Sequence, residues 1–286
     1  MARSIVILIA HFGRWPPWIN FFAESCRSNR DVDWVIFSDC GQMENASANL
    51  RVIDVTFDDY KRKVSRALDI HFAPDEPYKL CDIRPAFGVV HGDIIDGYDF
   101  FGFGDIDVIY GRLREFYDQQ LLSSFSAVSS HPERVSGHLF LLKNEARLVE
   151  AFQRVENWRQ VFSDPAYRSF DEYAFTSALK ADDRNTCWFR EAYSTPAATS
   201  RMLWYWENGV LSNEFYPHRS FAYLHFMHWR SSRWYPFHPH IAPGAKAPWE
   251  TAADVVRMDW RRAREDGFMI SPRGIEPLSR RSYPED

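Results

Sequence analysis

The chain has 286 residues, of which 45% are hydrophobic and 26% are charged. A chain of this length and composition can bury a sizeable core, which excludes a globally disordered protein. The net charge of −5 gives no reason to expect nucleic acid as the main partner, and the four cysteines include no C-x-x-C pair. We therefore expect neither a zinc ribbon nor a disulfide framework, and reduced thiols in a cytoplasmic protein.

The first half of the chain alternates strand and helix signals. Apolar, β-branched runs predict strands at residues 4–10, 34–37, 50–55 and 98–103, and helical spacing predicts a helix at 18–26. Strands that alternate with helices indicate βαβ units, so the predicted fold class is α/β with a mostly parallel central sheet and flanking helices. The composition shows no break sharp enough to indicate two independent domains, so we expect a single domain. Ligands of such sheets bind beyond the carboxyl ends of the strands.

Further along, apolar runs predict strands at residues 126–129 and 138–142, and helical spacing predicts helices at 79–88, 144–154, 171–179 and 249–263. After residue 195 the sequence becomes irregular, proline-rich and aromatic. No segment approaches the roughly 18 consecutive apolar residues that a membrane span needs, so we expect a soluble protein. The arginine-rich C-terminal stretch would suit a peripheral contact with an anionic membrane surface or an acidic polysaccharide. The alternative is a solvated helix face with a frayed tail.

The strongest chemical feature is the sequence Asp105-Ile106-Asp107, which directly follows the predicted strand at 98–103. Carboxylates at positions i and i+2 of a strand point to the same face, so at a strand end both can reach one hard cation. Apolar residues on both sides bury the motif, and buried paired carboxylates need a cation. A divalent ion there would neutralise charge on a diphosphate. The alternative is an exposed turn with solvated acids.

The block at residues 78–88 (Tyr-Lys-Leu-Cys-Asp-Ile-Arg-Pro-Ala-Phe-Gly), followed by Asp105 and Asp107, resembles a family of bacterial glycosyltransferase-like proteins associated with surface polysaccharide clusters. The order of motifs is similar to that of nucleotide-sugar glycosyltransferases with the GT-A fold. The resemblance implies a GT-A-like catalytic domain at 1–235 and a C-terminal extension at 236–286 with one helix and an Arg-rich tail. It also implies that the two carboxylates hold Mn²⁺ or Mg²⁺ against the donor diphosphate, with Ile106 at the donor.

In GT-A enzymes a histidine near the end of the catalytic domain often completes the metal shell, and His225 resembles that histidine. The chain then departs from the glycogenin-like pattern, because Met-His-Trp-Arg stands at 227–230 where that pattern has a glycine and a Lys-Pro-Trp. His228 is therefore an alternative to His225 as the ligand. An imidazole with two carboxylates suits Mn²⁺. Arg230 or Arg233 would replace the phosphate-binding lysine.

The resemblance also implies donor contacts in the first half of the chain, with Lys79 near the phosphate and Asp82 near ribose or sugar hydroxyls. The two residues lie one helical turn apart, so a surface ion pair is the alternative. At the ends of the predicted strands, Asp39 would read the base or the ribose and Phe12 would stack on the base.

Asp171 and Glu172 open the predicted helix at 171–179 and resemble the acidic pair that GT-A enzymes place beside the anomeric carbon. Residues 136–138 resemble the strand of small residues that forms the floor of the acceptor side in GT-A enzymes. Acids at a helix start also cap free N–H groups, and we expect capping to explain one of the two. The other would stabilise an oxocarbenium-like transition state or act as a general base. The sequence does not distinguish between them.

Together these features predict a metal-dependent hexosyltransferase that moves a sugar from a nucleotide-diphosphate sugar to a saccharide or lipid-linked saccharide in bacterial polysaccharide synthesis. A UDP-sugar is the first candidate for the donor. Two other classes stay open. A metal-dependent nucleotidyltransferase or phosphodiesterase also clamps phosphate with paired aspartates, but usually gathers more acids or a P-loop. A carbohydrate-binding protein would explain the 11 tryptophans, but would not need Asp105, Asp107 and His225 together.

Overall fold

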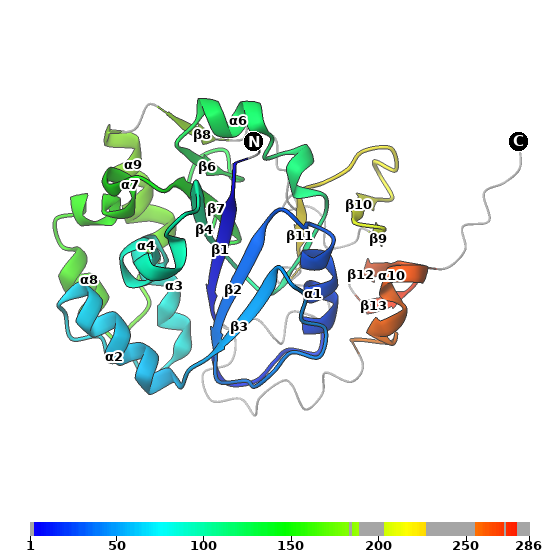
Figure 1. Cartoon of the computed structure of the whole chain (residues 1–286), viewed down its shortest axis with the longest axis horizontal. Helices are drawn as coiled ribbons and strands as arrows, with labels where there is room; N and C mark the ends of the chain where they lie inside the picture. The colour runs from blue at the N-terminus through cyan, green and yellow to red at the C-terminus, as the bar shows by residue number, and fades with distance from the viewer. Residues whose placement is uncertain (1–2, 183–184, 189–202, 227–254, 272, 279–286) are drawn as a thin grey trace, which may run out of the picture. The chain divides into compact units, whose positions relative to one another are not determined.

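The computed structural model describes residues 3–182, 185–188, 203–226, 255–271 and 273–278 (Figure 1). Its largest sheet has seven strands in the order β3-β2-β1-β4-β7-β6-β8. The strands are β1 (Ile5–Ala10), β2 (Asp33–Ser38), β3 (Leu50–Asp54), β4 (Phe100–Gly104), β6 (Ala127–Ser129), β7 (Leu139–Lys143) and β8 (Thr186–Trp188). All neighbours are parallel except β7, which is antiparallel to β4 and β6. The predicted α/β class with a mostly parallel sheet is therefore confirmed.

The strand directions explain how residues distant in sequence meet at one edge of the sheet. β1, β2, β3 and β4 run the same way, so their carboxyl ends share an edge. β7 runs the opposite way and begins at that edge, where Gly104 pairs with Leu139. A Cβ atom on Gly102 would collide with the carbonyl oxygen of Phe140. Glycine at this position therefore lets β4 and β7 pair closely.

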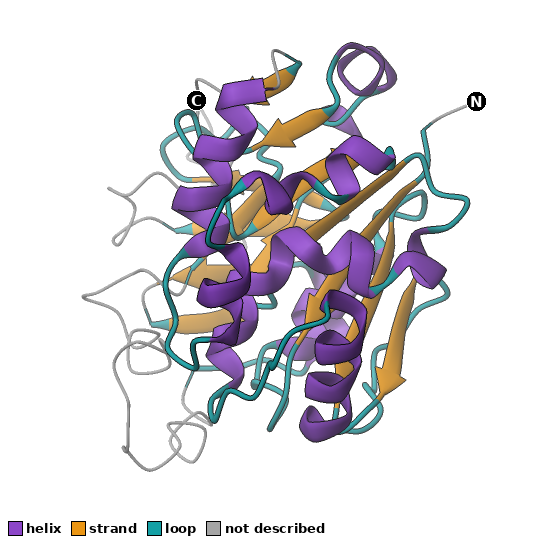
Figure 2. Cartoon of the chain, turned by 90° about the vertical axis from the view of Figure 1, so that its left-hand side faces the viewer, coloured by secondary structure: helices purple, strands orange, loops and turns teal. Residues whose placement is uncertain are grey.

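Helices lie over one side of this sheet, and Figure 2 shows them in front of the strands. Strand residues such as Leu8, Phe101 and Phe140 form a common core with Tyr60 and Phe175 from the helices. The helical elements are α2 (Phe57–Leu68), η1 (Pro77–Lys79), α3 (Leu80–Ile83), η2 (Arg84–Ala86), α4 (Phe87–Val90), α5 (Gly92–Ile95), α6 (Gln119–Ser124), α7 (Ala146–Val149), η4 (Ala151–Arg154), α8 (Trp158–Ser163), η5 (Phe170–Ala174) and α9 (Phe175–Asp182).

Three predicted helices are interrupted in the structure. The prediction at 79–88 corresponds to a succession of short helical turns from η1 to α4, in which Pro85 lacks the N–H that a continuous α-helix needs. The prediction at 144–154 divides into α7 and η4, and the prediction at 171–179 begins as the π-helix η5 before α9. The approximate locations were therefore right, but continuous helices were wrong.

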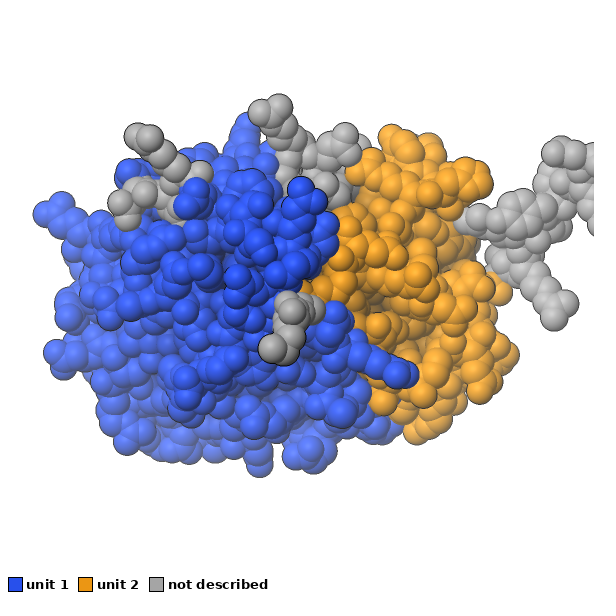
Figure 3. All heavy atoms as spheres, turned by 45° about the horizontal axis from the view of Figure 1, so that its top comes forward, with its two compact units in different colours: residues 1–14, 30–106, 117–192 blue, residues 15–29, 107–116, 193–286 orange. Residues whose placement is uncertain are grey.

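The described residues form two compact units (Figure 3). Unit 1 is residues 1–14, 30–106 and 117–192, and it holds the seven-stranded sheet with the helices above. Unit 2 is residues 15–29, 107–116 and 193–286. The predicted boundary at 235/236 lies outside the described residues. Within the described part of the chain, no helix is long and apolar enough to cross a membrane.

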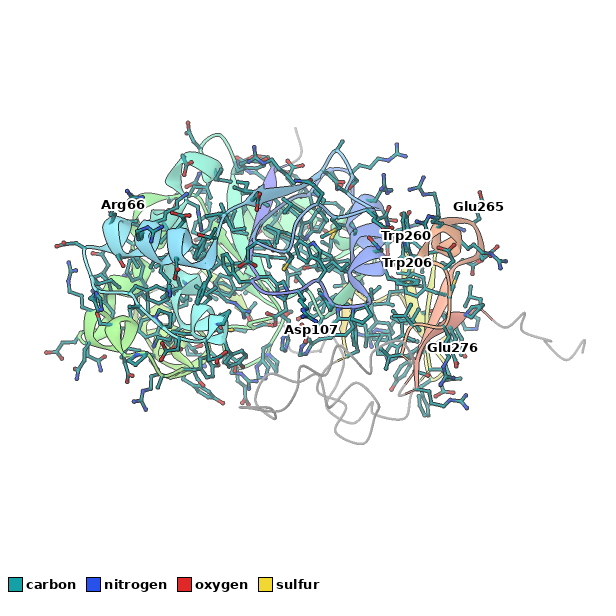
Figure 4. The ribbon with its side chains drawn as sticks, turned by 90° about the horizontal axis from the view of Figure 1, so that it is seen from below. Arg66, Asp107, Trp206, Trp260, Glu265 and Glu276 are labelled. Atoms are coloured by element: carbon teal, nitrogen blue, oxygen red, sulfur yellow. The ribbon has the colours of Figure 1, made fainter. Side chains whose placement is uncertain are left out.

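The described part of unit 2 contains two small antiparallel sheets and short helices. Its elements are α1 (Ile19–Arg27), β5 (Val108–Tyr110), η3 (Leu113–Glu115), β9 (Trp204–Glu207), β10 (Val210–Asn213), β11 (Tyr223–His225), η8 (Trp260–Arg262), α10 (Ala263–Asp266), β12 (Phe268–Ser271) and β13 (Gly274–Pro277). β11 pairs with β5, and the other four strands have the order β10-β9-β12-β13. Trp206, labelled in Figure 4, is buried in this unit and its indole N–H donates to the Tyr110 carbonyl at 2.9 Å.

The helix predicted at 249–263 is wrong over its described part. Residues 255–259 are not helical, and only η8 and the start of α10 are. Val256 instead forms a bridge with Ile275, and the Ile275 N–H donates to the Val255 carbonyl at 2.7 Å. The β-branched valines therefore join the antiparallel sheet, which suits their side chains better than a helix.

Candidate functional site

Asp105 lies just beyond the carboxyl end of β4, where β7 begins. Its backbone N–H donates to the His138 carbonyl at 3.3 Å, and its Oδ2 lies 3.3 Å from Nδ1 of His138. Its Oδ1 accepts a hydrogen bond from the Arg84 guanidinium. The antiparallel pairing of β4 with β7 thus brings together two of the residue types that divalent metals use as ligands, a carboxylate and an imidazole.

Arg84, from η2, connects this carboxylate to the acidic pair. Its guanidinium also donates to the Gly137 carbonyl at 3.0 Å and lies 3.6 Å from Oδ2 of Asp171. Burial alone would lower the pKa of Arg84, but the neighbouring Asp105 and other anionic groups outweigh it and raise the pKa well above the ordinary value. Arg84 therefore stays cationic beside the Asp105 carboxylate. Sequence reasoning did not single it out, although it belongs to the recognised block at 78–88.

Asp171 and Glu172 lie on the π-helix η5, a rare element that is frequent at functional sites. Asp171 is buried, and burial foremost raises its pKa to about 8, while Arg84 opposes the shift. Within the described part of the chain, its buried Oδ1 has no hydrogen-bond partner. Glu172 is more exposed and pairs with Arg134 at 3.3 Å. Sequence reasoning also missed Arg134.

Neither Asp171 nor Glu172 caps the backbone N–H groups at the start of this helix, although we expected one of them to do so. Arg84 and Arg134 are their ion-pair partners, and among the described residues no backbone N–H of this helix donates to either carboxylate. A π-helix that begins after Ser169, whose φ is 55°, does not present the first turn of an α-helix on which that expectation relied. Neither acid therefore has capping as its explanation.

Gly137 faces the same group of side chains. A Cβ atom there would lie 3.0 Å from the Arg84 guanidinium and 3.5 Å from a carboxylate oxygen of each of Asp171 and Glu172. The glycine therefore keeps a side chain out of the space beside both acids. Gly137 thus lies beside the acidic pair, and the acceptor floor at residues 136–138 stays a prediction.

Asp107 and His225 meet within unit 2. His225 ends β11, which pairs with β5 directly after Asp107. The His225 Nε2 lies 3.0 Å from Oδ2 of Asp107, and His225 is buried. The two residues are 118 positions apart in the chain. The sequence paired them only through the family resemblance, and the β5–β11 ribbon supplies the physical reason for their contact.

Lys79 and Asp82 form a buried ion pair at 2.8 Å. The Lys79 ammonium also donates to the carbonyls of Val161 and Ala166, so all three of its N–H groups are used. Asp82 accepts in addition from the backbone N–H groups of Arg168 and Phe170. In this structure the pair ties α3 to the segment that leads into η5. The ion-pair alternative describes these residues, although the pair is buried and not on the surface.

The remaining donor candidates differ in exposure. Phe12 is buried, with its ring centroid 5.1 Å from that of Phe57 and 5.2 Å from that of Tyr60. Asp39 is exposed at the carboxyl end of β2, where its Oδ1 accepts from the Gly13 N–H at 2.7 Å. Asp39 is thus accessible to a ligand, whereas the Phe12 ring is part of the core. Arg230, Arg233 and His228 lie outside the described residues.

Residues 7–235 match the model of a family of unknown function, DUF6625, and the chain belongs to this family. No curated protein matches the chain.

Three solved structures illustrate the more distant likenesses. The galactosyltransferase LgtC, in complex with donor and acceptor sugar analogs, is 14% identical, with 90% of this chain and 99% of that chain covered and a TM-score of 0.46. The glycosyltransferase GlyE of Streptococcus pneumoniae TIGR4 is 11% identical, with coverages of 91% and 62% and a TM-score of 0.44. Mouse xyloside xylosyltransferase 1 is 11% identical, with coverages of 65% and 85% and a TM-score of 0.37. Likenesses of this size do not establish an activity for the chain.

Proposed function

We propose that the chain is a metal-dependent GT-A glycosyltransferase that transfers a hexose from a nucleotide-diphosphate sugar to a saccharide or lipid-linked saccharide acceptor. A UDP-sugar is the first candidate for the donor. The observation that carries this proposal is the network in unit 1 in which Arg84 binds Asp105 and pairs with Asp171. It brings the first carboxylate of the D-x-D sequence together with the acidic pair. Transfer of a glycosyl group needs these two components: a site for the diphosphate and an anionic group near the anomeric carbon.

The residues present fit a divalent cation. Asp105 keeps Oδ2 directed at His138, and Asp107 directs its Oδ2 at His225. One residue separates the two aspartates in the chain, so their Cα atoms can be no more than about 7 Å apart. Carboxylate and imidazole donors suit Mn²⁺, and Mg²⁺ is the alternative. We propose Asp105, Asp107 and His225 as the ligands. When bound, the metal would neutralise charge on the donor diphosphate.

The other residues divide into donor-binding and reaction roles. Asp39 is accessible and offers an acceptor for ribose hydroxyls or the base. Glu172, the more exposed of the acidic pair, would stabilise positive charge at the anomeric carbon or act as a general base. Buried Asp171, which pairs with Arg84, would hold the guanidinium in place. We also propose that Arg230 binds the diphosphate and that Ile106 contacts the donor. The proposed setting is bacterial polysaccharide synthesis in the cytoplasm.

The test is donor hydrolysis and donor binding by the whole chain. UDP-glucose, UDP-galactose, UDP-N-acetylglucosamine and GDP-mannose are each incubated with and without Mn²⁺, and release of the nucleoside diphosphate is measured together with the melting temperature. Slow Mn²⁺-dependent release with one donor is expected, because GT-A sites admit water in place of the acceptor. A donor at 100 times its Kd would stabilise the fold by about 2.7 kcal/mol. Cleavage within the diphosphate would indicate the phosphodiesterase class, and absence of nucleotide binding would contradict the proposal.

A further inference from the structure

Unit 2 has a cleft with a volume of 1170 Å³. Its lining includes the β9–β10 hairpin, residues 217–220, the end of β13 and side chains from η3, η8 and α10. All lining residues belong to unit 2, and none is among the proposed donor, metal or reaction residues. Pockets for drug-sized ligands range over about 300–1,000 Å³, so this cleft can hold a ligand larger than that class.

One face of the two-stranded β9–β10 hairpin lines the cleft. Alternation along β9 buries Trp204 and Trp206 in the core of unit 2 and turns Tyr205 and Glu207 to the cleft. β10 continues the pattern, since Ser212 is paired with Tyr205 in the register and also lines the cleft. The period of two along each strand therefore separates a buried apolar face from a cleft-facing side that carries Tyr205, Glu207, Ser212 and Val210.

The charged side chains of the lining cancel one another. They are three arginines and three acids: Arg112, Arg219, Arg262, Glu115, Glu207 and Asp266. Arg112 lies 3.6 Å from Glu115, and Arg262 lies 2.5 Å from Asp266. Glu115 accepts a further hydrogen bond from the Ser220 hydroxyl at 3.0 Å. The six charged residues of the lining therefore carry no net charge and offer both hydrogen-bond donors and acceptors.

This chemistry selects among ligand classes. A phosphorylated or sulfated ligand needs an excess of unpaired cations, and an apolar ligand needs a mostly apolar wall. The cleft provides neither. A neutral sugar carries hydroxyls that both donate and accept, so it can donate to carboxylates and accept from guanidinium groups in the same site. The face of its ring can also pack on an aromatic side chain such as Tyr205.

We propose that this cleft binds a neutral saccharide chain of several sugar units. The site is separate in its residues from the proposed donor site, and the proposal does not depend on the proposed function. If the chain is a glycosyltransferase, the cleft provides a second point of attachment for a polymeric acceptor.

The experiment measures binding of three neutral hexasaccharides, maltohexaose, cellohexaose and laminarihexaose, to the full chain by calorimetry in the absence of nucleotide and metal. Wild-type protein is expected to bind at least one. Glu207→Ala and Arg112→Ala should each weaken that binding by about fivefold or more, the loss of one sugar hydrogen bond to a charged group. Glu265→Ala is the matched control, because Glu265 is exposed beside Asp266 but does not line the cleft (Figure 4).

Two further measurements, the melting temperature and donor hydrolysis, make the experiment decisive. Melting temperatures establish that each variant is folded, and the two substitutions stand on different elements, so the failure of one to fold leaves the other as the test. Donor hydrolysis with Mn²⁺ should be unchanged in both variants, and its absence from the wild type would bear on the proposed function alone. The proposal is overturned if no hexasaccharide binds at millimolar concentration, if the two variants bind like the control, or if a sulfated oligosaccharide binds better than its neutral counterpart.

Discussion

Arg84 donates a hydrogen bond to the carboxylate of Asp105, although the two residues are 21 positions apart in the chain. The same guanidinium donates to the Gly137 carbonyl and faces Asp171 at 3.6 Å. A planar cation with this many partners holds the Asp105 side chain in one orientation, since guanidinium groups bind oxygen acceptors with fixed geometry. The carboxylate is thereby kept at the edge of the sheet, with its second oxygen toward His138.

If Arg84 positions Asp105, then Arg84→Lys should impair metal use more than it impairs folding. Lysine keeps the charge but cannot reach three partners with a planar fork. We expect the Mn²⁺ concentration for half-maximal donor hydrolysis to rise about tenfold, as a perturbed neighbour of a metal ligand typically causes. Arg62→Lys, at an exposed pair with Asp59, is the control. Equal Mn²⁺ dependence in both variants would show that Arg84 does not position the ligand.

The Asp107–His225 contact predicts a shared metal dependence. Asp107→Asn should abolish Mn²⁺-dependent donor binding while the protein stays folded, and His225→Ala should raise the Mn²⁺ concentration needed for half-maximal hydrolysis. Calorimetric titration of Mn²⁺ in the presence of the donor measures both. Asp58→Asn and His71→Ala, at exposed positions of unit 1, are the controls. Wild-type metal dependence in Asp107→Asn would remove Asp107 from the ligand set, and an effect seen only with His228→Ala would assign the histidine ligand to His228.

Lys79→Met should be strongly destabilising. The substitution preserves the volume of the side chain but leaves the buried Asp82 carboxylate without its cation, which typically costs about 3–5 kcal/mol. The free energy of unfolding in urea measures the loss. Lys61→Met is a matched control, since Lys61 pairs with Asp58 at 2.8 Å with the same spacing of three, but Asp58 is exposed. Such surface pairs contribute about 1 kcal/mol or less. Similar losses in the two variants would contradict the structural role of Lys79.

His91 predicts a loss of stability in acid. It is buried, its Nε2 lies 2.8 Å from the Tyr60 hydroxyl, and its ring stacks on Phe37. Burial, and to a smaller extent Lys63, lowers its pKa well below the ordinary value. The unfolded chain therefore takes up a proton below about pH 6.5 that the folded chain does not bind, so stability falls as pH decreases through that range.

The contribution of one such group is at most about 1.4 kcal/mol per pH unit. His91→Gln cannot titrate, so its unfolding free energy should fall less steeply between pH 6.5 and 5 than that of the wild type, whatever its absolute stability. Urea unfolding at several pH values measures the slope. His71→Gln, at an exposed position, should keep the wild-type slope. An unchanged slope in His91→Gln would mean that His91 is protonated in the folded state.

The central strands could be predicted because their sequence patterns are local. β1, β2 and β4 are continuous apolar runs, and the structure has them within two residues of the predicted bounds. The β9–β10 hairpin was missed although its turn carries a strong local signal. Asn208 and Gly209 both have positive φ, as the two central residues of a type I′ turn require, and Asn-Gly is the preferred pair there. The many aromatic residues around it were interpreted as irregular structure.

The arginines of the site could not be predicted in the same way. Arg84 meets Asp171 only because η2 and η5 lie beside one edge of the folded sheet, and no periodicity in the sequence records this contact. Unit 2 presents the same difficulty on a larger scale, since it is assembled from three separate stretches of the chain. Breaks in composition mark domains that are contiguous in sequence, and a unit of this kind leaves none.

Asp171 and Glu172 are adjacent in sequence but differ in environment, and this difference predicts different effects of substitution. Asp171 is buried against Arg84, whereas the Glu172 side chain is 20% exposed and pairs with Arg134. If Glu172 stabilises charge or moves a proton in the reaction, Glu172→Gln keeps its shape and stability but should lower turnover by roughly 100-fold or more. Asp171→Asn, by contrast, should lower turnover through the displaced guanidinium and should also raise the Mn²⁺ requirement.

Turnover, melting temperature and donor affinity measured on the same proteins separate these roles. Glu133→Gln is the control for Glu172, because Glu133 is an exposed glutamate beside Arg134 in the chain. A Glu172→Gln variant with turnover within a few-fold of the wild type would exclude it as the reacting carboxylate. If Asp171→Asn then lost turnover at an unchanged Mn²⁺ requirement, Asp171 would take that role. Retention of turnover by both variants would leave the acidic pair as partners of Arg84 and Arg134 only, with the reacting group elsewhere.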